Sequence, residues 1–270
     1  MSEPAVLYDK QAGIATVTMN RPEVRNSINP EMLCRLADAW QDINDDPAVR
    51  VAILTGTGDK AFCAGADLEK LVRMMHGLRP PETEYDERIR ADYSIIYKGL
   101  LRNYQVNKPI IAAVKGFCVA GGTEILQATD IRVAAEDAQF AIAEVKHSLF
   151  PMGGSTVRLP RQIAFCHAME ILLTGERFSA ADALRVGLIN KVVPASLVMA
   201  EARRYAEIIG ANGPLAVQAV KRSVLAGLGV PTAQALEKEQ EIGIPVSMSE
   251  DAKEGTKAFK EKRKPVFKGR

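Results

Sequence analysis

Two glutamates, Glu124 and Glu144, stand twenty positions apart in segments that are otherwise apolar. Glu124 follows the glycine pair Gly121 and Gly122, and Glu144 lies within residues 139–151. Two carboxylates that share a poorly hydrated site do not both ionise easily, so one pKa rises and an acid and a base coexist near neutral pH. The pair is therefore a candidate for acid/base catalysis beside a site for an anion.

The glycine pair falls where a strand is expected to turn into a helix. Residues 110–114 have the pattern of a buried strand, and a helix is predicted to begin at Gly121. The first N–H groups of a helix lack partners and lie at its positive end, so they stabilise an oxyanion. A carboxylate in the first turn, such as Glu124, is also favourable on structural grounds alone, by about 0.3–1 kcal/mol. Both interpretations of this segment remain open.

A second candidate for anion binding follows the strand predicted at residues 51–55. Small residues from Ala64 to Ala66 would let a ligand approach the backbone, with the N–H of Ala66 pointing outward. Asp67 is predicted to cap the helix that follows. The same residues also fit an ordinary connection between a strand and a helix.

Ordered blocks of sequence resemble the crotonase (enoyl-CoA hydratase/isomerase) superfamily along nearly the whole chain. These blocks are residues 20–28, 61–68, 116–124, 138–151, 173–175, 183–188 and 258–264. The resemblance implies an α/β fold with a crotonase-like ββα spiral core over residues 1–195. It also implies a C-terminal helical oligomerisation region over residues 196–270, which would assemble a homotrimer or a hexamer made of two trimers.

The resemblance also implies the chemistry of the site. The substrate would be an acyl-CoA thioester whose carbonyl oxygen is held by the backbone N–H groups of Ala66 and Gly121, the oxyanion hole. Glu124 and Glu144 would hold a water molecule, one taking its proton and the other protonating the α-carbon. No separate cofactor is expected, because coenzyme A is part of the substrate. The residues implied to bind the substrate are Val24, Arg25, Ala64, Ala66, Asp67, Leu68, Phe259 and Lys262, of which Phe259 and Lys262 would reach coenzyme A in a neighbouring subunit.

Retention of both carboxylates favours hydration of a 2-enoyl-CoA, because related isomerases often keep only the later glutamate. Isomerisation of a double bond, thioester hydrolysis and carbon-carbon cleavage are alternatives that share the same pocket. A non-catalytic subunit that binds acyl-CoA is an alternative of another class, because fold alone does not secure function.

Several residues depart from the family pattern. Thr123 stands where a small residue is usual, and its hydroxyl either adds a hydrogen bond or fills space. Residues 141–143 replace a common glycine and proline, and Met152 replaces a glycine, which together predict a remodelled acyl pocket. The chain between Asp67 and Lys108 is also about a dozen residues longer than in a compact hydratase. That stretch either lines a site for a bulky acyl group or forms an extra helical turn with a surface loop.

Composition excludes several other classes. A net charge of +2 on 270 residues, with basic residues concentrated only in the tail, argues against nucleic-acid binding. No apolar run approaches the length of a membrane span. The run from Gly153 to Thr156 does not place its serine as a nucleophile elbow does.

Metal, disulfide and export signals are not found in the sequence. Three histidines without an HExxH motif or paired CxxC spacing predict no metal site. The N-terminus lacks the charged and apolar segments of an export signal, and the four cysteines form no disulfide framework. A cytoplasmic protein is expected. The cysteines are Cys34, Cys63, Cys118 and Cys166.

Overall fold

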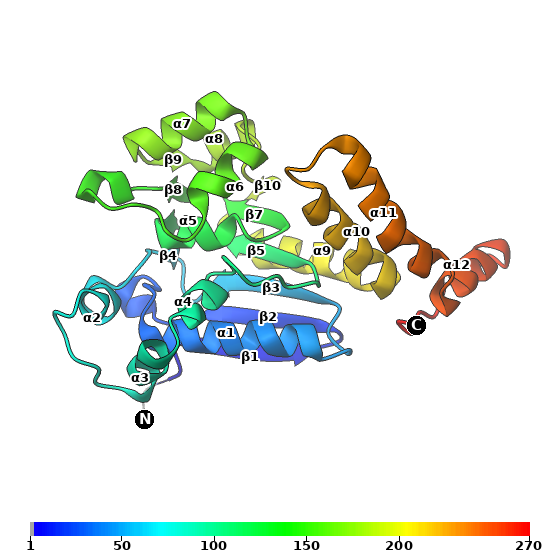
Figure 1. The fold of residues 1–270 in the computed structure, drawn as a ribbon, viewed down its shortest axis with the longest axis horizontal. Coiled ribbons are helices and arrows are strands. Elements are labelled where there is room, and N and C mark those ends of the chain that lie inside the picture. The colour runs from blue at the N-terminus through cyan, green and yellow to red at the C-terminus, as the bar shows by residue number, and fades with distance from the viewer. Residues whose placement is uncertain (1–2) are drawn as a thin grey trace.

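The computed structural model describes residues 3–270, which form two β-sheets surrounded by helices (Figure 1). The larger sheet has the strand order β1-β2-β3-β5-β7-β10, and the smaller has the order β4-β6-β8-β9. The strands are β1 (Val6–Gln11), β2 (Ile14–Met19), β3 (Val51–Gly56), β4 (Ala61–Cys63), β5 (Ile110–Val114), β6 (Phe117–Val119), β7 (Ile131–Ala135), β8 (Gln139–Ala141), β9 (Phe178–Ser179) and β10 (Lys191–Val193).

The helices lie between these strands and after the last one. The α-helices are α1 (Pro30–Asp45), α2 (Arg73–Met75), α3 (Glu84–Ala91), α4 (Ser94–Gly99), α5 (Gly121–Leu126), α6 (Ser155–Gln162), α7 (Phe165–Thr174), α8 (Ala180–Arg185), α9 (Val198–Gly210), α10 (Pro214–Gly227), α11 (Thr232–Ser247) and α12 (Glu250–Lys260). Four short helices of other types are η1 (Pro22–Val24), η2 (Leu68–Val72), η3 (Glu144–His147) and η4 (Ala195–Leu197), of which η2 is a π-helix. In the described part of the chain, no helix is long and apolar enough to cross a membrane.

The chain repeats one unit three times. In each unit the first strand joins the larger sheet, the second joins the smaller sheet, and helical turns follow. The units begin at β3, β5 and β7, and their strands pair in parallel, with Leu54 beside Ala112 and Cys118 beside Phe140. This arrangement and the C-terminal helices confirm the predicted α/β fold with a ββα spiral. It also brings the ends of β4, β6 and β8, which lead to the candidate residues, to one edge of the smaller sheet.

Packing against the larger sheet forms the core. All residues of β3 and β5 are buried, as expected for central parallel strands covered on both faces. On one side α1 begins as predicted, with Pro30 in its first turn and the Asn29 side chain accepting a hydrogen bond from the Met32 N–H at 2.8 Å. Trp40 of α1 is fully buried, and its indole N–H donates to the Gly99 carbonyl at 3.0 Å.

The C-terminal helices differ in how they meet the core. The buried residues Val198, Ala202 and Ala206 of α9 belong to the main hydrophobic core. In contrast, α10 to α12 extend away from the sheets (Figure 1). Their exposed apolar side chains include Val220, Val224, Leu228, Leu236 and Ile244. The division at residues 195 and 196 and the oligomeric state stay predictions.

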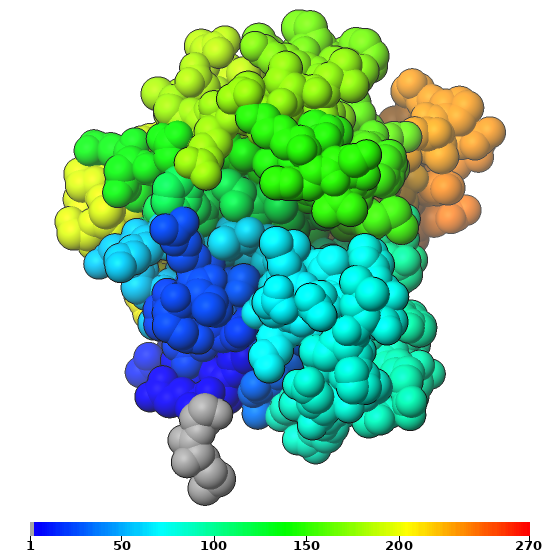
Figure 2. All heavy atoms as spheres, turned by 90° about the vertical axis from the view of Figure 1, so that its left-hand side faces the viewer, coloured from blue at the N-terminus to red at the C-terminus, as the bar shows by residue number. Residues whose placement is uncertain are grey.

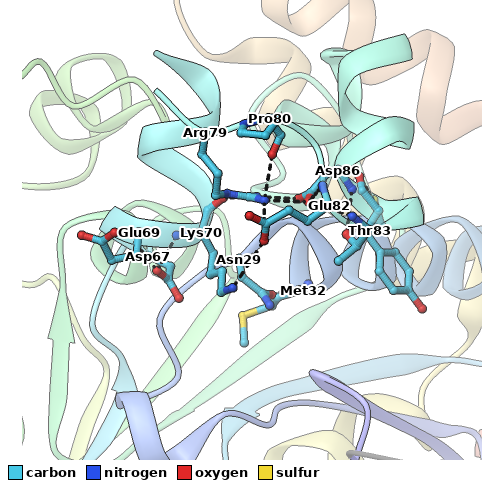
Figure 3. A network of polar contacts seen from close by, with 12 residues as sticks. Asn29, Met32, Asp67, Glu69, Lys70, Arg79, Pro80, Glu82, Thr83 and Asp86 are labelled. Carbon is cyan, nitrogen blue, oxygen red and sulfur yellow. Dashed lines mark hydrogen bonds and ion pairs between the residues drawn. The ribbon is translucent and has the colours of Figure 1, made fainter. Parts of the chain in front are cut away.

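The long connection between Asp67 and Lys108 is folded into short helices that a buried ion pair holds together (Figure 3). Arg79 Nη1 and Nη2 lie 3.1 and 2.9 Å from the two carboxylate oxygens of Asp86. The same guanidinium donates to the carbonyl of Lys70 in η2 at 2.7 Å. Asp86 also accepts hydrogen bonds from the backbone N–H groups of Glu82 and Thr83, and its side chain is 2% exposed. The connection is therefore tied to the segment that follows β4.

We expect the Asp86→Ala variant to lose about 3 kcal/mol of unfolding free energy, because Arg79 would lose its buried partner and keep only the half-exposed Glu82 as a carboxylate contact. The matched control is Asp38→Ala, which removes an ion pair with Arg88 whose side chains are 58% and 42% exposed. That change should cost less than about 1 kcal/mol. Urea unfolding of both variants at one protein concentration measures the difference, and equal losses would contradict the account.

Candidate active site

The loop after β4 leaves one backbone N–H free at Ala66. Ala66 forms a single parallel bridge with Ile28, in which the Ile28 N–H donates to the Gly65 carbonyl at 2.8 Å. The Asp67 N–H then donates to the Ile28 carbonyl at 2.9 Å. Because successive N–H groups of an extended chain point in opposite directions, the N–H of Ala66 points away from Ile28. In residues 3–270 it donates to no acceptor.

A second free N–H lies at Gly121, the first residue of α5. The residue before it, Ala120, has φ 49° and ψ −125°, a strained conformation for a residue with a side chain. Its own N–H is held by the Ala141 carbonyl at 2.9 Å. The Gly121 N–H donates to no acceptor within the described chain. The strain sits at the turn that orients this N–H.

The two free N–H groups are neighbours because the backbones approach closely at Gly65. A Cβ atom on Gly65 would lie 2.8 Å from the Ala120 Cβ and 3.4 Å from the Gly121 nitrogen. A Cβ atom on Gly121 would in turn lie 3.9 Å from the Ala66 nitrogen. Gly65 has φ +88°, a conformation that favours glycine. The structure thus brings together the two N–H groups that the sequence singled out, and adds Gly65 to them.

Glu124 lies on α5, and its carboxylate is enclosed by residues from a distant part of the chain. Its side chain is buried, and a Cβ atom on Gly153 would lie 2.5 Å from its Oε2. The Ser155 N–H donates to Oε1 at 3.3 Å. Burial raises the pKa of Glu124, while hydrogen bonds from Ser155 and Gly153 and the charge of Arg158 act in the opposite direction. The pKa of Glu124 is raised overall, and these groups limit the rise by favouring the ionised form.

Glu144 begins η3 just after β8 and has very different surroundings. Its Oε2 is buried and has no hydrogen-bond partner in the described part of the protein. Burial, and then the nearby charge of Glu124, raise the pKa of Glu144 to about 7. One carboxyl group is thus surrounded by donors, whereas the other holds a proton up to neutral pH. An acid and a base can coexist here.

Thr123 hydrogen-bonds and does not merely fill space. Its hydroxyl lies 2.6 Å from the Cys118 carbonyl and 2.9 Å from the Ala141 carbonyl, and the side chain is fully buried. It therefore ties α5 to the ends of β6 and β8, from which Gly121 and Glu144 follow.

The predicted substrate-binding residues before α2 gather around the loop of Ala66. The Ala64 N–H donates to the Arg25 carbonyl at 3.0 Å, which joins that loop to η1. Asp67 caps η2 as predicted, accepting from the Glu69 and Lys70 N–H groups at 3.1 and 2.9 Å. Its other oxygen pairs with Arg21 at 2.9 Å, so the Asp67 carboxylate holds the loop together. The side chains of Val24 and Leu68 are exposed, 40% and 65% respectively.

The remaining predicted binding residues are remote from this loop in the same chain. Phe259 lies on α12 and is 88% exposed. Lys262 follows the end of that helix. Figure 1 shows α12 at the opposite end of the molecule from α2 and β4. Figure 2 looks onto the left-hand side of Figure 1, where the cyan surface after β4 meets the green surface after β8. One chain alone does not bring Phe259 and Lys262 to the glutamates.

Sequence reasoning missed four residues around Glu124, namely Gln127, Gly153, Ser155 and Arg158. Arg158 donates to the Gly153 carbonyl at 3.3 Å and to the Leu101 carbonyl. The signal that could have found them is the run of Gly153, Gly154 and Ser155, whose glycines allow a close backbone approach. Among residues 3–270, no three His, Cys, Asp or Glu side chains gather where a metal ion could be held.

Comparisons with known proteins agree with this geometry. A family model described as enoyl-CoA hydratase/isomerase matches residues 9–270. The chain therefore belongs to the enoyl-CoA hydratase/isomerase family.

Its relatives span nearly its whole length. An enoyl-CoA hydratase, EchA19, from Mycobacterium tuberculosis is 45% identical over 100% of this chain and 98% of its own. The (E)-benzylidenesuccinyl-CoA hydratase of Thauera aromatica is 41% identical over 95% of this chain and 96% of its own. The crystal structure of an enoyl-CoA hydratase from Bacillus anthracis superposes with a TM-score of 0.88 at 37% identity, covering 98% of this chain and 100% of that one.

We expect the Glu144→Gln variant to be more stable than the wild type at pH 8, by up to about 3 kcal/mol. Folding raises the pKa of this carboxyl from 4.5 to about 7. The folded wild type therefore becomes less stable as the pH rises through that range. The advantage of the variant should therefore shrink towards pH 5 and vanish below about pH 4.5. Urea unfolding across this pH range measures it.

The matched control for this prediction is Glu176→Gln, at a glutamate whose side chain is 72% exposed. It should show no such pH-dependent advantage. Equal stability of Glu144→Gln and wild type at pH 8 would contradict the raised pKa.

Proposed function

We propose that this protein is an enoyl-CoA hydratase, which adds water across the 2,3 double bond of a 2-enoyl-CoA thioester. The observation that carries the proposal is the pair of unequal carboxyls, Glu124 with its donors and Glu144 without a partner. Two free backbone N–H groups, at Ala66 and Gly121, lie close to each other, and Gly121 begins the helix that carries Glu124. Relatives named as hydratases support the same reaction.

In the proposed reaction the thioester oxygen accepts hydrogen bonds from the N–H groups of Ala66 and Gly121. Negative charge moves onto this oxygen when the nucleophile adds, and donors already in place stabilise it without reorganisation. Loss of one such donor typically costs about 10²–10³ in rate.

The two carboxyls divide the proton transfers. Glu124, whose donors favour its ionised form, takes a proton from water as the hydroxyl adds to C3 of the enoyl group. Glu144, protonated near neutral pH, gives its proton to C2 as the enolate collapses. Exchange with solvent then returns each group to its starting state, so a proton is neither gained nor lost over the cycle.

The coenzyme A portion is proposed to lie along the residues that gather beside Ala66, namely Val24, Arg25, Ala64, Asp67 and Leu68. Phe259 and Lys262 would complete this site from a neighbouring subunit of a homotrimer or hexamer. Exposed apolar side chains on α10 and α11 support such an assembly. No cofactor beyond the substrate's own coenzyme A is required.

The acyl group and the location are further parts of the proposal. A relative named for a ring-bearing acyl-CoA, at 41% identity, supports testing substrates larger than crotonyl-CoA. Met152 and Phe150, close in sequence to Gly153, are 53% and 63% exposed and offer apolar surface for such a group. Free cysteines, three of them buried, support a reducing, cytoplasmic setting.

We expect the purified protein to remove the enoyl-thioester absorbance of crotonyl-CoA or of an aryl-substituted 2-enoyl-CoA, with incorporation of oxygen from labelled water. Glu124→Gln and Glu144→Gln should each lower kcat by about 10²–10⁴, because each removes a proton-transfer group. Glu176→Gln, at an exposed glutamate, should retain wild-type activity.

Three results would overturn this proposal. Full activity of folded Glu124→Gln would show that its carboxylate takes no part. Consumption of the substrate without incorporation of labelled oxygen would point to isomerisation, and binding without turnover on any enoyl chain to a non-catalytic acyl-CoA subunit.

A further inference from the structure

A buried side-chain pair lies directly behind the Glu124 carboxylate. Gln127 follows the last residue of α5, and Ser155 is the first residue of α6. Gln127 Nε2 donates to Ser155 Oγ at 2.9 Å. Gln127 is 2% exposed and Ser155 is fully buried, so water does not compete for this contact. Neither residue belongs to the acid/base pair or to the two free N–H groups.

The hydrogen-bonding capacity of these groups sets the direction of the chain of contacts. A serine hydroxyl has one hydrogen to donate and two lone pairs, whereas an amide NH₂ can only donate. Because Gln127 Nε2 occupies a lone pair of Ser155 Oγ, the single hydroxyl hydrogen is left for another acceptor. We take the Glu124 carboxylate as that acceptor, because the Ser155 N–H already donates to Glu124 Oε1 at 3.3 Å and the Ser155 side chain favours the ionised form of Glu124.

The main chain of Gln127 is fixed by hydrogen bonds from two other side chains. Its main-chain carbonyl accepts hydrogen bonds from Gln162 Nε2 at 2.8 Å and from Arg132 Nη2 at 3.1 Å. Arg132, only 7% exposed, also donates to the Leu188 carbonyl at 2.8 Å. Its Nη2 also lies 3.0 Å from Gln162 Oε1. The amide that orients Ser155 is therefore anchored to α6 and to the segment before β10.

Within residues 3–270, the charged groups near Glu124 do not donate a hydrogen bond to its carboxylate. Arg158 of α6 uses its guanidinium on the carbonyls of Gly153 and Leu101, so it acts on Glu124 by charge and not by a hydrogen bond. Glu144 of η3 is a carboxyl whose pKa is raised by the charge of Glu124. Side-chain donation to the Glu124 carboxylate therefore comes from Ser155.

We infer that Gln127 and Ser155 are positioning residues for the proposed hydration, which orient the Glu124 carboxylate and keep it ionised. The inference rests on the proposed function and deepens it by giving a reason why Glu124, and not Glu144, is the base. Gln127 acts through Ser155, and neither residue touches the substrate. If an acceptor replaced the donating amide of Gln127, it would compete with Glu124 for the hydroxyl hydrogen of Ser155.

The test is the pH dependence of kcat/KM for Ser155→Ala, Gln127→Leu and Gln127→Glu. Loss of one hydrogen bond to a charged acceptor should move the acid limb, where Glu124 becomes protonated, up by about one pH unit. In all three variants kcat should fall by up to about tenfold at pH values below the wild-type acid limb, with little change in KM and little loss above the shifted limb. The double variant Ser155→Ala with Gln127→Leu should shift no further than Ser155→Ala, because the two residues act in series.

Controls separate this role from a purely structural one. Ser247→Ala removes a hydroxyl on α11 that bonds the carbonyl of Ile244 at 2.8 Å, and it should leave the acid limb in place. A loss of kcat that is equal at every pH would indicate a structural defect and overturn the inference. An acid limb of Ser155→Ala that coincides with the wild-type limb would also overturn it.

A failure of the proposed function can be told apart from a failure of this inference. A wild type that hydrates no enoyl-CoA refutes the hydratase proposal, and the same variants are then compared by carbon-13 NMR titration of labelled glutamate carboxyls. An upward shift of the Glu124 signal in Ser155→Ala supports the positioning role, and an unchanged signal overturns it.

Discussion

Burying two carboxyl groups in one poorly hydrated site costs free energy, because each loses its water and each charge repels the other. The structure limits that cost by giving Glu124 and Glu144 unequal surroundings. Donors from the start of α6 and the charge of Arg158 favour the ionised form of Glu124. Glu144 has an unpartnered oxygen and keeps its proton to about neutral pH. The proposed division into base and acid follows from this difference.

The fold provides these surroundings through close approaches of backbone. The repeated strand units bring the loops after β4, β6 and β8 to one edge of the smaller sheet. There Gly65 lets the free N–H groups of Ala66 and Gly121 lie near each other, and Gly153 lets α6 begin against the carboxylate of Glu124. The strained turn at Ala120 is held by its hydrogen bond to β8. Strain and buried charge at one site are typical of a protein that gives up stability for function.

Local signals in the sequence predicted much of this arrangement. Apolar runs predicted β3 and β5, and the pairing of Asn29 with Pro30 predicted the start of α1, because these features depend on residues close together in the chain. Glu124 and Glu144 were recognisable as charges in apolar segments. The roles of the substrate-binding residues came from family resemblance and stay predictions.

Other features depend on packing between segments far apart in the sequence. Ser155 reaches Glu124 across 31 positions and Gln127 across 28, so neither contact has a local signature. The ion pair between Arg79 and Asp86 was equally hidden, although the spacing of Thr83 and Asp86 at the start of α3 has the form of a capping box. The unpartnered oxygen of Glu144 arises only when the surrounding surfaces have packed.

The measurement that tests the central claim most directly is the titration of the two carboxyls by carbon-13 NMR. Protein labelled at the glutamate carboxyl carbons would be compared with Glu124→Gln and Glu144→Gln to assign the two signals. The account predicts that the signal absent from Glu144→Gln titrates near pH 7 in the wild type and at lower pH in Glu124→Gln, while Glu124 ionises at a lower pH than Glu144. A Glu144 signal that titrates near 4.5, with no response to loss of Glu124, would contradict the account.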